Sequence, residues 1–274
     1  MIAWYNKFIP KCKEAQSLNL SFDTGAAIEG YHSKTQIARI LTETWVARNM
    51  YCPRCGYTHI THFENNRPVA DFFCPACGNE YELKSQSRKL SHKVNDGTFN
   101  TMIERITANN NPDFFFMHYS KADMEVSELI LVPKHFFTPA VIEKRKPLPP
   151  TARRAGWVGC NILIDRIPKQ GRISIISNGI SMDAEDVVRK VQASKRLEIR
   201  DIGNRAWTMD ILDCINRVAA QIFTLEDIYR YERELQAKHP QNHHIRPKIR
   251  QQLQFLRDLG YITFMGHGKY QIIR

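Results

Sequence analysis

Residues 68–84 read PVADFFCPACGNEYELK, and this stretch decides the fold that the sequence predicts. Both flanks of the CPAC segment are rich in β-forming residues, so we expect an antiparallel hairpin with CPAC as its turn. In such a hairpin Asp71 faces Glu82 across the strands, and Glu82 and Lys84, two residues apart, point to the same side. The hairpin therefore brings two carboxylates and one amine together.

Paired carboxylates beside a lysine are typical of one kind of chemistry. Mg²⁺ is bound through one or two carboxylates and keeps sites for water and substrate phosphate. A nearby lysine lowers the pKa of an attacking water or stabilises the negative charge of the transition state in phosphodiester hydrolysis. The alternative is that Glu82 and Lys84 are solvent-facing charges of a ribbon and that Asp71 is a turn residue. Because Asp71 lies on the partner strand, we favour a metal site at Asp71 and Glu82.

The cysteines around this hairpin predict a second metal site. The chain has seven cysteines, which are Cys12, Cys52, Cys55, Cys74, Cys77, Cys160 and Cys214. Four of them form two C-x-x-C pairs, Cys52–Cys55 and Cys74–Cys77, at a spacing typical of a tetrahedral zinc site. Gly56 and Gly78 follow the pairs, where a tight turn favours positive φ. A redox pair or free structural thiols are the alternatives, and we assign no role to the other three cysteines.

Composition restricts the function classes. The 274 residues include 39 Lys or Arg and 28 Asp or Glu, so the formal net charge is +11. Hydrophobic residues make up 43% of the chain, as in ordinary globular proteins, which excludes global disorder, collagen and repeat architectures. The positive charge favours a polyanionic partner or an anionic membrane surface. The sequence shows neither a signal peptide nor a long apolar run, so we expect a soluble, cytoplasmic protein.

The order of the expected elements predicts a sandwich of helices and sheet, of the mixed α/β (α+β) class, built around the hairpin. Glu43 lies within the first expected helix, away from its apolar stripe. We interpret it as a solvated charge, with assistance to metal binding as the alternative. The expected helices cover 33–48 and 95–108, and the expected strands cover 68–73, 80–84, 113–119 and 128–132.

This order and the trio of Asp71, Glu82 and Lys84 resemble the PD-(D/E)XK nuclease superfamily. Ala70 stands where many members have proline. The resemblance implies that Asp71, Glu82 and the backbone carbonyl of Leu83 hold catalytic Mg²⁺, and that Lys84 completes the catalytic set.

Longer stretches resemble the DpnI-like family of methylation-dependent (type IIM) restriction endonucleases. The resemblance covers roughly 33–274 and implies cleavage of double-stranded DNA at GATC sites carrying N6-methyladenine, with Mg²⁺ as catalytic ion and Zn²⁺ as structural ion. It implies a monomer without an obligate protein partner. The stretches that carry it are 38–43, 62–71, 150–157, 159–161 and 248–253.

The segment 144–172 carries eight basic residues and one acidic residue. Because it is also rich in proline, we expect an extended loop or strand edge that follows phosphates. Arg153 and Arg154 are candidates for phosphate contacts or bidentate contacts to guanine. We expect Trp157 to contact the methyl-bearing edge of adenine, with a core aromatic as the alternative.

The C-terminal part predicts a winged helix, a second DNA reader. Helices are expected at 207–218, 224–236 and 246–259, and a hairpin at 261–273. Pro247 must occupy the first turn of the third helix. A protein-docking winged helix is the alternative, and we disfavour His243 and His244 as metal ligands. The candidate DNA contacts are Asn242, His243, His244, Arg246, Lys248 and Lys269.

These observations together predict an N-terminal extension at 1–32 without assigned function, a PD-(D/E)XK catalytic domain with its zinc site at 33–195, and a winged-helix domain at 196–274. We expect both domains to read methylated DNA. The competing hypothesis is a non-catalytic transcription regulator built from a zinc ribbon and a winged helix. The acidic pair and lysine discriminate between the two, because a regulator has no use for them.

Overall fold

The structure is a computed structural model that describes residues 18–273 except 24, 26–29, 31 and 65–69. The chain divides into two compact units, each assembled from separate segments. Unit 1 comprises the described residues up to Val94, together with Asn110–Lys134 and Gly171–Lys195. Unit 2 comprises Asn95–Asn109, His135–Gln170 and the residues from Arg196 onward.

Unit 1 is built on a seven-stranded sheet of order β1-β2-β3-β5-β6-β9-β10. β3 and β5 run parallel, and the other neighbouring strands are antiparallel. The strands are β1 (Thr61–His62), β2 (Phe72–Phe73), β3 (Glu80–Gln86), β5 (Asp113–Ser120), β6 (Glu125–Val132), β9 (Ile173–Ser177) and β10 (Ile180–Ser181).

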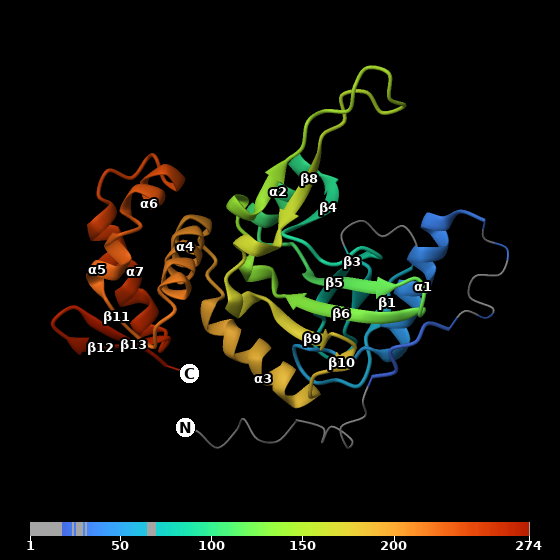
Figure 1. Cartoon of the computed structure of the whole chain (residues 1–274), viewed down its shortest axis with the longest axis horizontal. Coiled ribbons are helices and arrows are strands. Elements are labelled where there is room, and N and C mark those ends of the chain that lie inside the picture. The colour runs from blue at the N-terminus through green and yellow to red at the C-terminus, as the bar shows by residue number, and fades with distance from the viewer. Residues whose placement is uncertain (1–17, 24, 26–29, 31, 65–69, 274) are drawn as a thin grey trace. The chain divides into compact units, whose positions relative to one another are not determined.

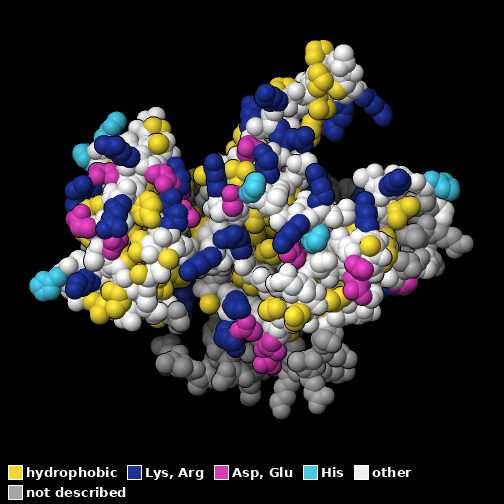
Figure 2. Space-filling view, in the orientation of Figure 1, with side chains coloured by type: hydrophobic (Ala, Val, Ile, Leu, Met, Phe, Trp, Pro, Cys, Tyr) yellow, Lys and Arg dark blue, Asp and Glu magenta, His cyan; other side chains and the backbone are white. Residues whose placement is uncertain are grey.

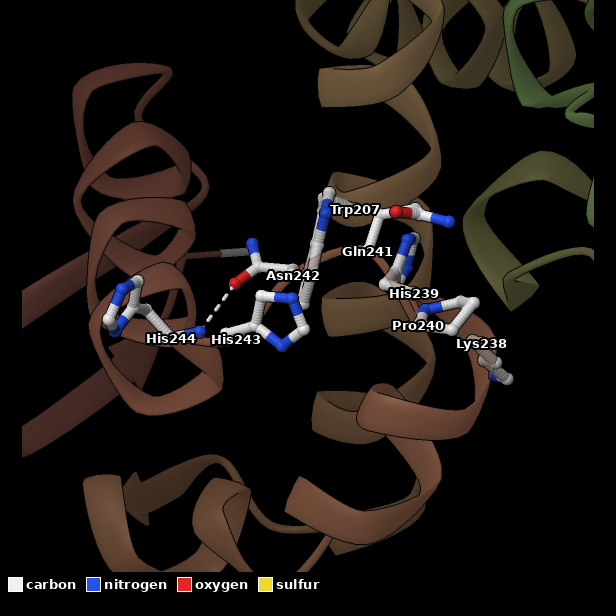
Figure 3. Close-up of a pocket in the computed structure, with 8 residues that line it drawn as sticks. All are labelled: Trp207, Lys238, His239, Pro240, Gln241, Asn242, His243 and His244. Carbon is white, nitrogen blue, oxygen red and sulfur yellow. Dashed lines mark hydrogen bonds between the residues drawn. The ribbon is translucent and has the colours of Figure 1, made fainter.

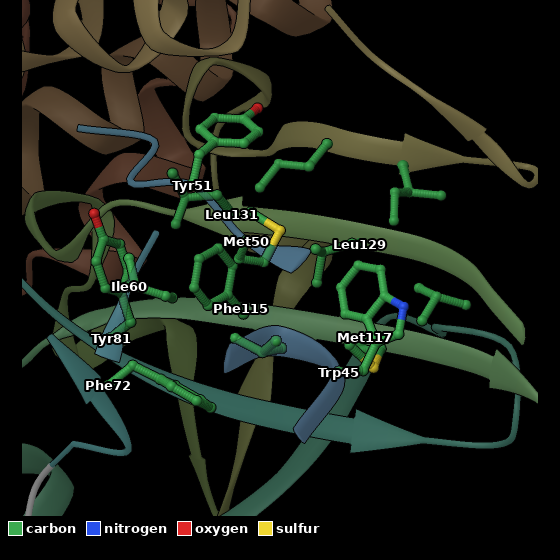
Figure 4. Close-up of a cluster of buried hydrophobic side chains, with 14 of the residues drawn as sticks. Trp45, Met50, Tyr51, Ile60, Phe72, Tyr81, Phe115, Met117, Leu129 and Leu131 are labelled. Atoms are coloured by element: carbon green, nitrogen blue, oxygen red, sulfur yellow. The ribbon is translucent and has the colours of Figure 1, made fainter. Parts of the chain in front are cut away.

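Helices α1 (Lys34–Asn49) and α3 (Ala184–Ser194) supply side chains to the core of this sheet. Trp45 of α1 is buried in one cluster with Phe115 and Leu129, which come from β5 and β6 (Figure 4). Alternate residues of the two central strands face this cluster, which explains why both strands are so rich in apolar residues. The predicted mixed α/β architecture is observed.

Residues 18–23, which the sequence places in an N-terminal extension, pack against this core. The backbone N–H of Val126 donates to the Leu20 carbonyl at 2.9 Å, and that of Phe22 donates to the Met124 carbonyl at 2.8 Å. The Trp45 indole N–H donates to the Asn19 carbonyl at 2.8 Å. Of the rest of the extension, residues 1–17, 24, 26–29 and 31 lie outside the described residues.

Two of the expected elements, the strand 68–73 and the helix 95–108, differ from the structure. The expected strand 68–73 is observed only as β2, since 65–69 lie outside the described residues. The expected helix 95–108 was wrong at its start, because 95–98 complete strand β4 (Lys93–Thr98) and the helix α2 is Phe99–Thr107. The Asn-Asp-Gly-Thr sequence at 95–98 has poor helix propensity, and pairing with β8 stabilises it as strand instead.

Unit 2 contains the small sheet β4-β8-β7, with β7 at Ile142–Lys144 and β8 at Gly159–Leu163. Between β7 and β8 the segment 145–158, here called the arm, continues the hairpin and projects beyond its sheet (Figure 1). Its backbone is paired by Arg145 N–H to Gly159 at 3.0 Å and by Leu148 N–H to Trp157 at 2.9 Å. The expected extended loop or strand edge is thus observed, over 145–158, as extended backbone paired into a hairpin.

The part of unit 2 from Ile202 to Ile272 is a winged helix. Thr224 forms the predicted capping box with Asp227, but the second expected helix breaks at Arg230–Tyr231 into two. The first helix starts five residues earlier than expected, since Asp201 caps it through Asn204 N–H at 2.7 Å. The elements are α4 (Ile202–Val218), β11 (Ile222–Thr224), α5 (Leu225–Tyr229), α6 (Glu232–Lys238), α7 (Ile245–Asp258), β12 (Ile262–Gly266) and β13 (Lys269–Ile272).

Within unit 2, α4 is held to α2 by a buried arginine. Arg205 donates to Asn109 Oδ1 at 2.6 Å and to the Ile106 carbonyl at 2.9 Å. Its guanidinium thus satisfies backbone and side-chain oxygens at the end of α2. Among the helices that the structure describes, every one is too short or too polar to cross a bilayer.

Candidate functional site

The four cysteines of the two C-x-x-C pairs come together in unit 1. The Sγ atoms of Cys52 and Cys77 are 3.7 Å apart, as are those of Cys55 and Cys74, and all four lie within 4.8 Å of one another. A tetrahedral zinc ion with Zn–S bonds of about 2.3 Å requires Sγ separations of about 3.8 Å. The cluster therefore fits a metal such as zinc.

The two cysteine pairs sit in turns of the same geometry. Cys52 N–H donates to Tyr57 at 2.8 Å and Gly56 N–H returns to Cys52 at 2.8 Å. In the second turn, Cys74 N–H donates to Asn79 at 2.9 Å and Gly78 N–H returns to Cys74 at 2.8 Å. Gly56 and Gly78 have φ of 77° and 70°, the positive values expected from the sequence.

Hydrogen bonds already favour a thiolate in the cluster. A bond from Cys52 and one from the Asn79 N–H lower the pKa of Cys77 to about 5. The same bond to Cys77, together with burial, raises the pKa of Cys52 above its ordinary value. Burial raises the pKa of Cys55 to about 11. The hydroxyl of Tyr81 lies 3.1 Å from Cys52 Sγ and orients it from outside the cluster.

The cysteine turn leads directly to the acidic pair and lysine on β3. Phe72 pairs with Tyr81 and Phe73 with Glu80, so Asp71 precedes the paired part of the hairpin. The Asp71 N–H donates to the Tyr81 carbonyl at 2.9 Å, and Asp71 Oδ2 accepts from Leu83 N–H at 2.7 Å. The carboxylate of Asp71 is therefore attached to the edge of β3 beside Glu82.

Glu82 and Lys84 project from the same side of β3, as the sequence predicts. Lys84 Nζ lies 2.5 Å from Glu82 Oε1, with both side chains less than one fifth exposed. The ammonium also lies 6.0 Å above the ring of Phe114, which is fully buried. The lysine is thus held by a charge on one side and an aromatic face on the other.

The electrostatics connect Asp71 with this pair and with a further carboxylate. Burial and the charge of Glu43 raise the pKa of Asp71, whereas the Leu83 N–H, Lys84 and Arg39 lower it. In the described part of the chain, only the cysteines form a group of three or more ligands within 4.8 Å of one another. Asp71 and Glu43 are close enough for the charge of Glu43 to act on Asp71.

Glu43 is the further carboxylate that acts on Asp71, although the sequence alone predicts a solvated charge at this position. It accepts from Arg39 Nε at 2.6 Å, and its other oxygen lies 3.1 Å from His62 Nε2. Arg39 is one helical turn before Glu43, a spacing that signals an ion pair. His62 was missed, because β1 brings it to α1 through tertiary contacts alone.

In the arm, Trp157 is half-buried and held from three sides. Its indole N–H donates to Thr98 Oγ1 at 3.2 Å, and the Arg154 guanidinium lies 4.7 Å from the ring centre. A Cβ at Gly159 would come within 2.6 Å of the ring, so glycine is required there. Arg153 and Arg154 are exposed, and Figure 2 shows Lys and Arg side chains gathered along the arm.

The expected contacts of the winged helix lie at the start of α7 and on the wing. Asn242, His243 and His244 line a cavity of about 490 Å³, where Asn242 Oδ1 accepts from His244 N–H at 2.8 Å (Figure 3). His243, His244 and Lys269 are exposed.

Two other expected contacts are engaged within the winged helix. Arg246 pairs with Glu232 at 2.8 Å and stacks over Tyr229. Lys248 donates to Gln251 at 2.8 Å and to Asn204 at 3.2 Å. Both would have to exchange these bonds for phosphates or bases.

The sequence reading missed the aromatic wall of this cavity. Trp207 stacks on His239 with ring centres 3.9 Å apart, and His239 Nε2 lies 2.7 Å from Asp210 Oδ2. The two rings come from α4 and the end of α6 (Figure 3). Their separation by about thirty residues in the chain leaves no local signal.

Two family models match the chain. The model described as DpnI, Dam-replacing family, matches residues 18–200, which is about two thirds of the sequence. The model described as DpnI_C, Dam-replacing HTH domain, matches residues 203–272. The first match begins upstream of residue 33 and includes the segment 18–23 that packs in unit 1.

Proposed function

The chain belongs to the DpnI family of Dam-replacing proteins, and on that basis we propose that it is a methylation-dependent restriction endonuclease. Its substrate is double-stranded DNA at GATC sites that carry N6-methyladenine, and its catalytic ion is Mg²⁺. The observation that carries the nuclease assignment is the convergence of Asp71, Glu82 and Lys84 at the edge of β3.

The residues of the trio have distinct roles in this proposal. Asp71, Glu82 and the carbonyl of Leu83 hold the Mg²⁺, which supplies Lewis-acid stabilisation of the phosphate oxygens. Lys84, held beside Glu82, would donate to the scissile phosphate or lower the pKa of the attacking water through its positive charge. The ion pair with Glu82 and the ring of Phe114, 6.0 Å from the ammonium, keep Lys84 beside the carboxylates.

The cysteine cluster has a structural role in the proposal. Zinc bound to the four thiolates fixes the turn between β2 and β3, and this sets the position of Asp71 relative to Glu82. A four-cysteine set leaves no open coordination position for a substrate, which is typical of structural zinc.

DNA is read at two places. The arm presents Arg153, Arg154 and Trp157, where the arginines contact phosphate or guanine and the indole contacts the methyl-bearing adenine. The winged helix places the start of α7 in the major groove, with residues 242–248 toward the bases and Lys269 of the wing toward the backbone. Requiring both contacts raises discrimination beyond that of either reader.

The competing function is a zinc-ribbon and winged-helix regulator that binds DNA without cutting it. The two hypotheses differ in their use of β3. A regulator does not require Glu82 and Lys84 to be held in a half-buried pair beside Asp71. We therefore favour the nuclease.

The test uses pure protein, Mg²⁺ and one GATC-containing plasmid prepared from adenine-methylating and non-methylating hosts. We expect cleavage of the methylated plasmid alone and loss of cleavage in Asp71→Asn. Lys121→Ala, which removes an exposed charge from the turn after β5, serves as the control and should cut normally. Binding without cutting by the wild type would support the regulator, and equal cutting of both plasmids would overturn methyl dependence.

A further inference from the structure

The wing of the winged helix carries two exposed apolar side chains. Phe264 is 46% exposed and Met265 is 52% exposed, and they are neighbours on β12. Exposure of large hydrophobic side chains to water is unfavourable, and their burial against a partner removes that cost. Two adjacent ones on an element that is proposed to bind DNA therefore indicate a binding surface.

The geometry of the wing aims these side chains outward. β12 is an edge strand, and its pairing with β13 shifts between Phe264 and Gly266, which leaves Met265 as the extra residue of a bulge. The hairpin closes through His267 and Gly268, whose φ values of 47° and 71° are typical of a tight two-residue turn. The tip is consequently short and its side chains are displayed at fixed positions.

Phe264 is supported from inside by a row of aromatic rings. Phe223, Tyr270 and Phe264 are paired across the three strands of the wing sheet. The ring centres of Phe223 and Tyr270 are 5.5 Å apart, and those of Tyr270 and Phe264 are 5.2 Å apart. Exposure rises along the row from 1% at Phe223 to 46% at Phe264. The row is a rigid support whose outer ring reaches solvent.

The surroundings of the pair are basic. Arg250 and Arg257 on α7 lie close enough to Tyr270, the middle ring of the row, for their charges to act on its hydroxyl. Lys269 and His267 are exposed at the tip. Figure 2 shows hydrophobic side chains beside Lys, Arg and His side chains where Figure 1 places the hairpin of β12 and β13. An apolar pair framed by cations suits a polyanion with stacked apolar faces.

We propose that Phe264 and Met265 form a wedge that enters the minor groove of duplex DNA beside the site read by α7. The wedge partly unstacks one base step and bends the duplex. Apolar residues inserted in this way typically kink DNA by about 20–90°. The proposal rests on the proposed function, because it requires the winged helix to bind DNA.

The experiment compares binding and bending of a short duplex with one methylated GATC site, in buffer without divalent cations. Donor and acceptor dyes at the ends report bending, and 2-aminopurine placed in turn at each flanking step reports unstacking. With the wild type we expect shorter end-to-end distance and brighter 2-aminopurine at one step. The double variant Phe264→Ala/Met265→Ala should lose both signals and bind roughly tenfold more weakly.

Matched variants separate the wedge from general effects. Ile222 is 48% exposed on β11, which pairs with β13 at the other edge of the same sheet. It pairs with Gln271 and lies on the face opposite Phe223. Ile222→Ala should bind and bend like the wild type. Met265→Ser tests the wedge without touching the aromatic row, and Met265→Leu should retain the bend. Thermal melts confirm that each variant folds.

The outcomes are distinguishable from those of the proposed function. Wild-type protein that binds without bending, or a double variant that bends as the wild type does, overturns the wedge while leaving cleavage intact. Self-association that the double variant abolishes, with unchanged DNA bending, assigns the pair to a second copy and also overturns it. Absence of cleavage of methylated plasmid instead tests the proposed function, since the bending assay needs no catalysis.

Discussion

The two candidate metal sites of this protein share the β2–β3 hairpin but are assembled differently. The cysteine site draws on two local turns of identical geometry, and its thiols already stand at zinc-like separations. The carboxylate site joins β3, the residue before β2 and α1, and its groups bond to Leu83, Lys84 and Arg39 instead of one centre. The preset thiols suit the proposed structural zinc, whereas the exchangeable bonds of the carboxylates suit the proposed catalytic ion.

The largest expected effect is on the cysteine site. Cys74→Ser should lose most of the bound zinc, and unit 1 should no longer unfold cooperatively. The reason is that structural zinc contributes on the order of 10 kcal/mol to the free energy of folding. Zinc content by mass spectrometry and thermal melts followed by circular dichroism measure both effects.

Cys214→Ala is the matched control for that experiment. Cys214 is buried in α4 of unit 2 and is not a member of the four-cysteine cluster, and burial raises the pKa of its thiol to about 12. The control should retain zinc, with only the modest loss of stability that a small cavity causes. A Cys74→Ser protein as stable as this control would contradict the local, preset character of the site.

Lys84→Ala should produce the opposite pattern. We expect cleavage to fall by about 10²–10³-fold, since a transition-state cation is lost, while the melting temperature changes little. Single-turnover cleavage of a methylated duplex is the measurement, with Lys121→Ala again as control. If melting and cleavage fell together, Lys84 would be a structural residue and the contrast between the sites would disappear.

The two sites should also respond to pH in opposite directions. The pKa of Asp71 is raised in the folded protein, so the folded state binds more protons there than the unfolded state. This contribution lowers stability as pH rises from the unfolded value near 3.8 through the raised folded pKa. The cysteine site should instead lose zinc and stability as pH falls, because its thiolates become protonated.

Urea unfolding of the zinc-loaded protein between pH 4 and 7, without Mg²⁺, compares the wild type with Asp71→Asn. The variant should show a steeper net gain of stability with rising pH, since the opposing contribution of Asp71 is removed. Identical pH profiles would show that Asp71 does not carry a raised pKa.

The smallest effect is expected at Glu43. Glu43→Gln should raise the Mg²⁺ concentration needed for half-maximal cleavage by about tenfold, because it removes a charge that acts on Asp71. Glu185→Gln, at the exposed start of α3, is the control. Unchanged Mg²⁺ dependence would limit the carboxylate site to Asp71 and Glu82.

Prediction from sequence succeeded where the signal is local. The C-x-x-C spacing predicts the cluster of four thiols, and the glycines that follow the pairs predict positive φ. Strand alternation predicts that Glu82 and Lys84 share one side of β3, as they do in the structure. The break between α5 and α6 was missed, because the capping box marks the start of a helix and carries no information on where it ends.

Non-local pairing explains the other differences. Residues 95–98 became strand because β8, some sixty residues later, offers them a partner. His62 and the ring of Trp157 acquired their contacts in the same way, through residues distant in the chain. The role of Trp157 in DNA binding remains a prediction.

Sequence by itself determined that four thiols and an acidic pair with a lysine accompany one hairpin, since turn geometry and strand alternation act over a few residues. Only the tertiary structure decided that Glu43 lies near Asp71, that Gly159 must lack a Cβ beside Trp157, and that an aromatic row supports Phe264. Those relations depend on which strands and helices meet, and that choice is made by burial of the whole core.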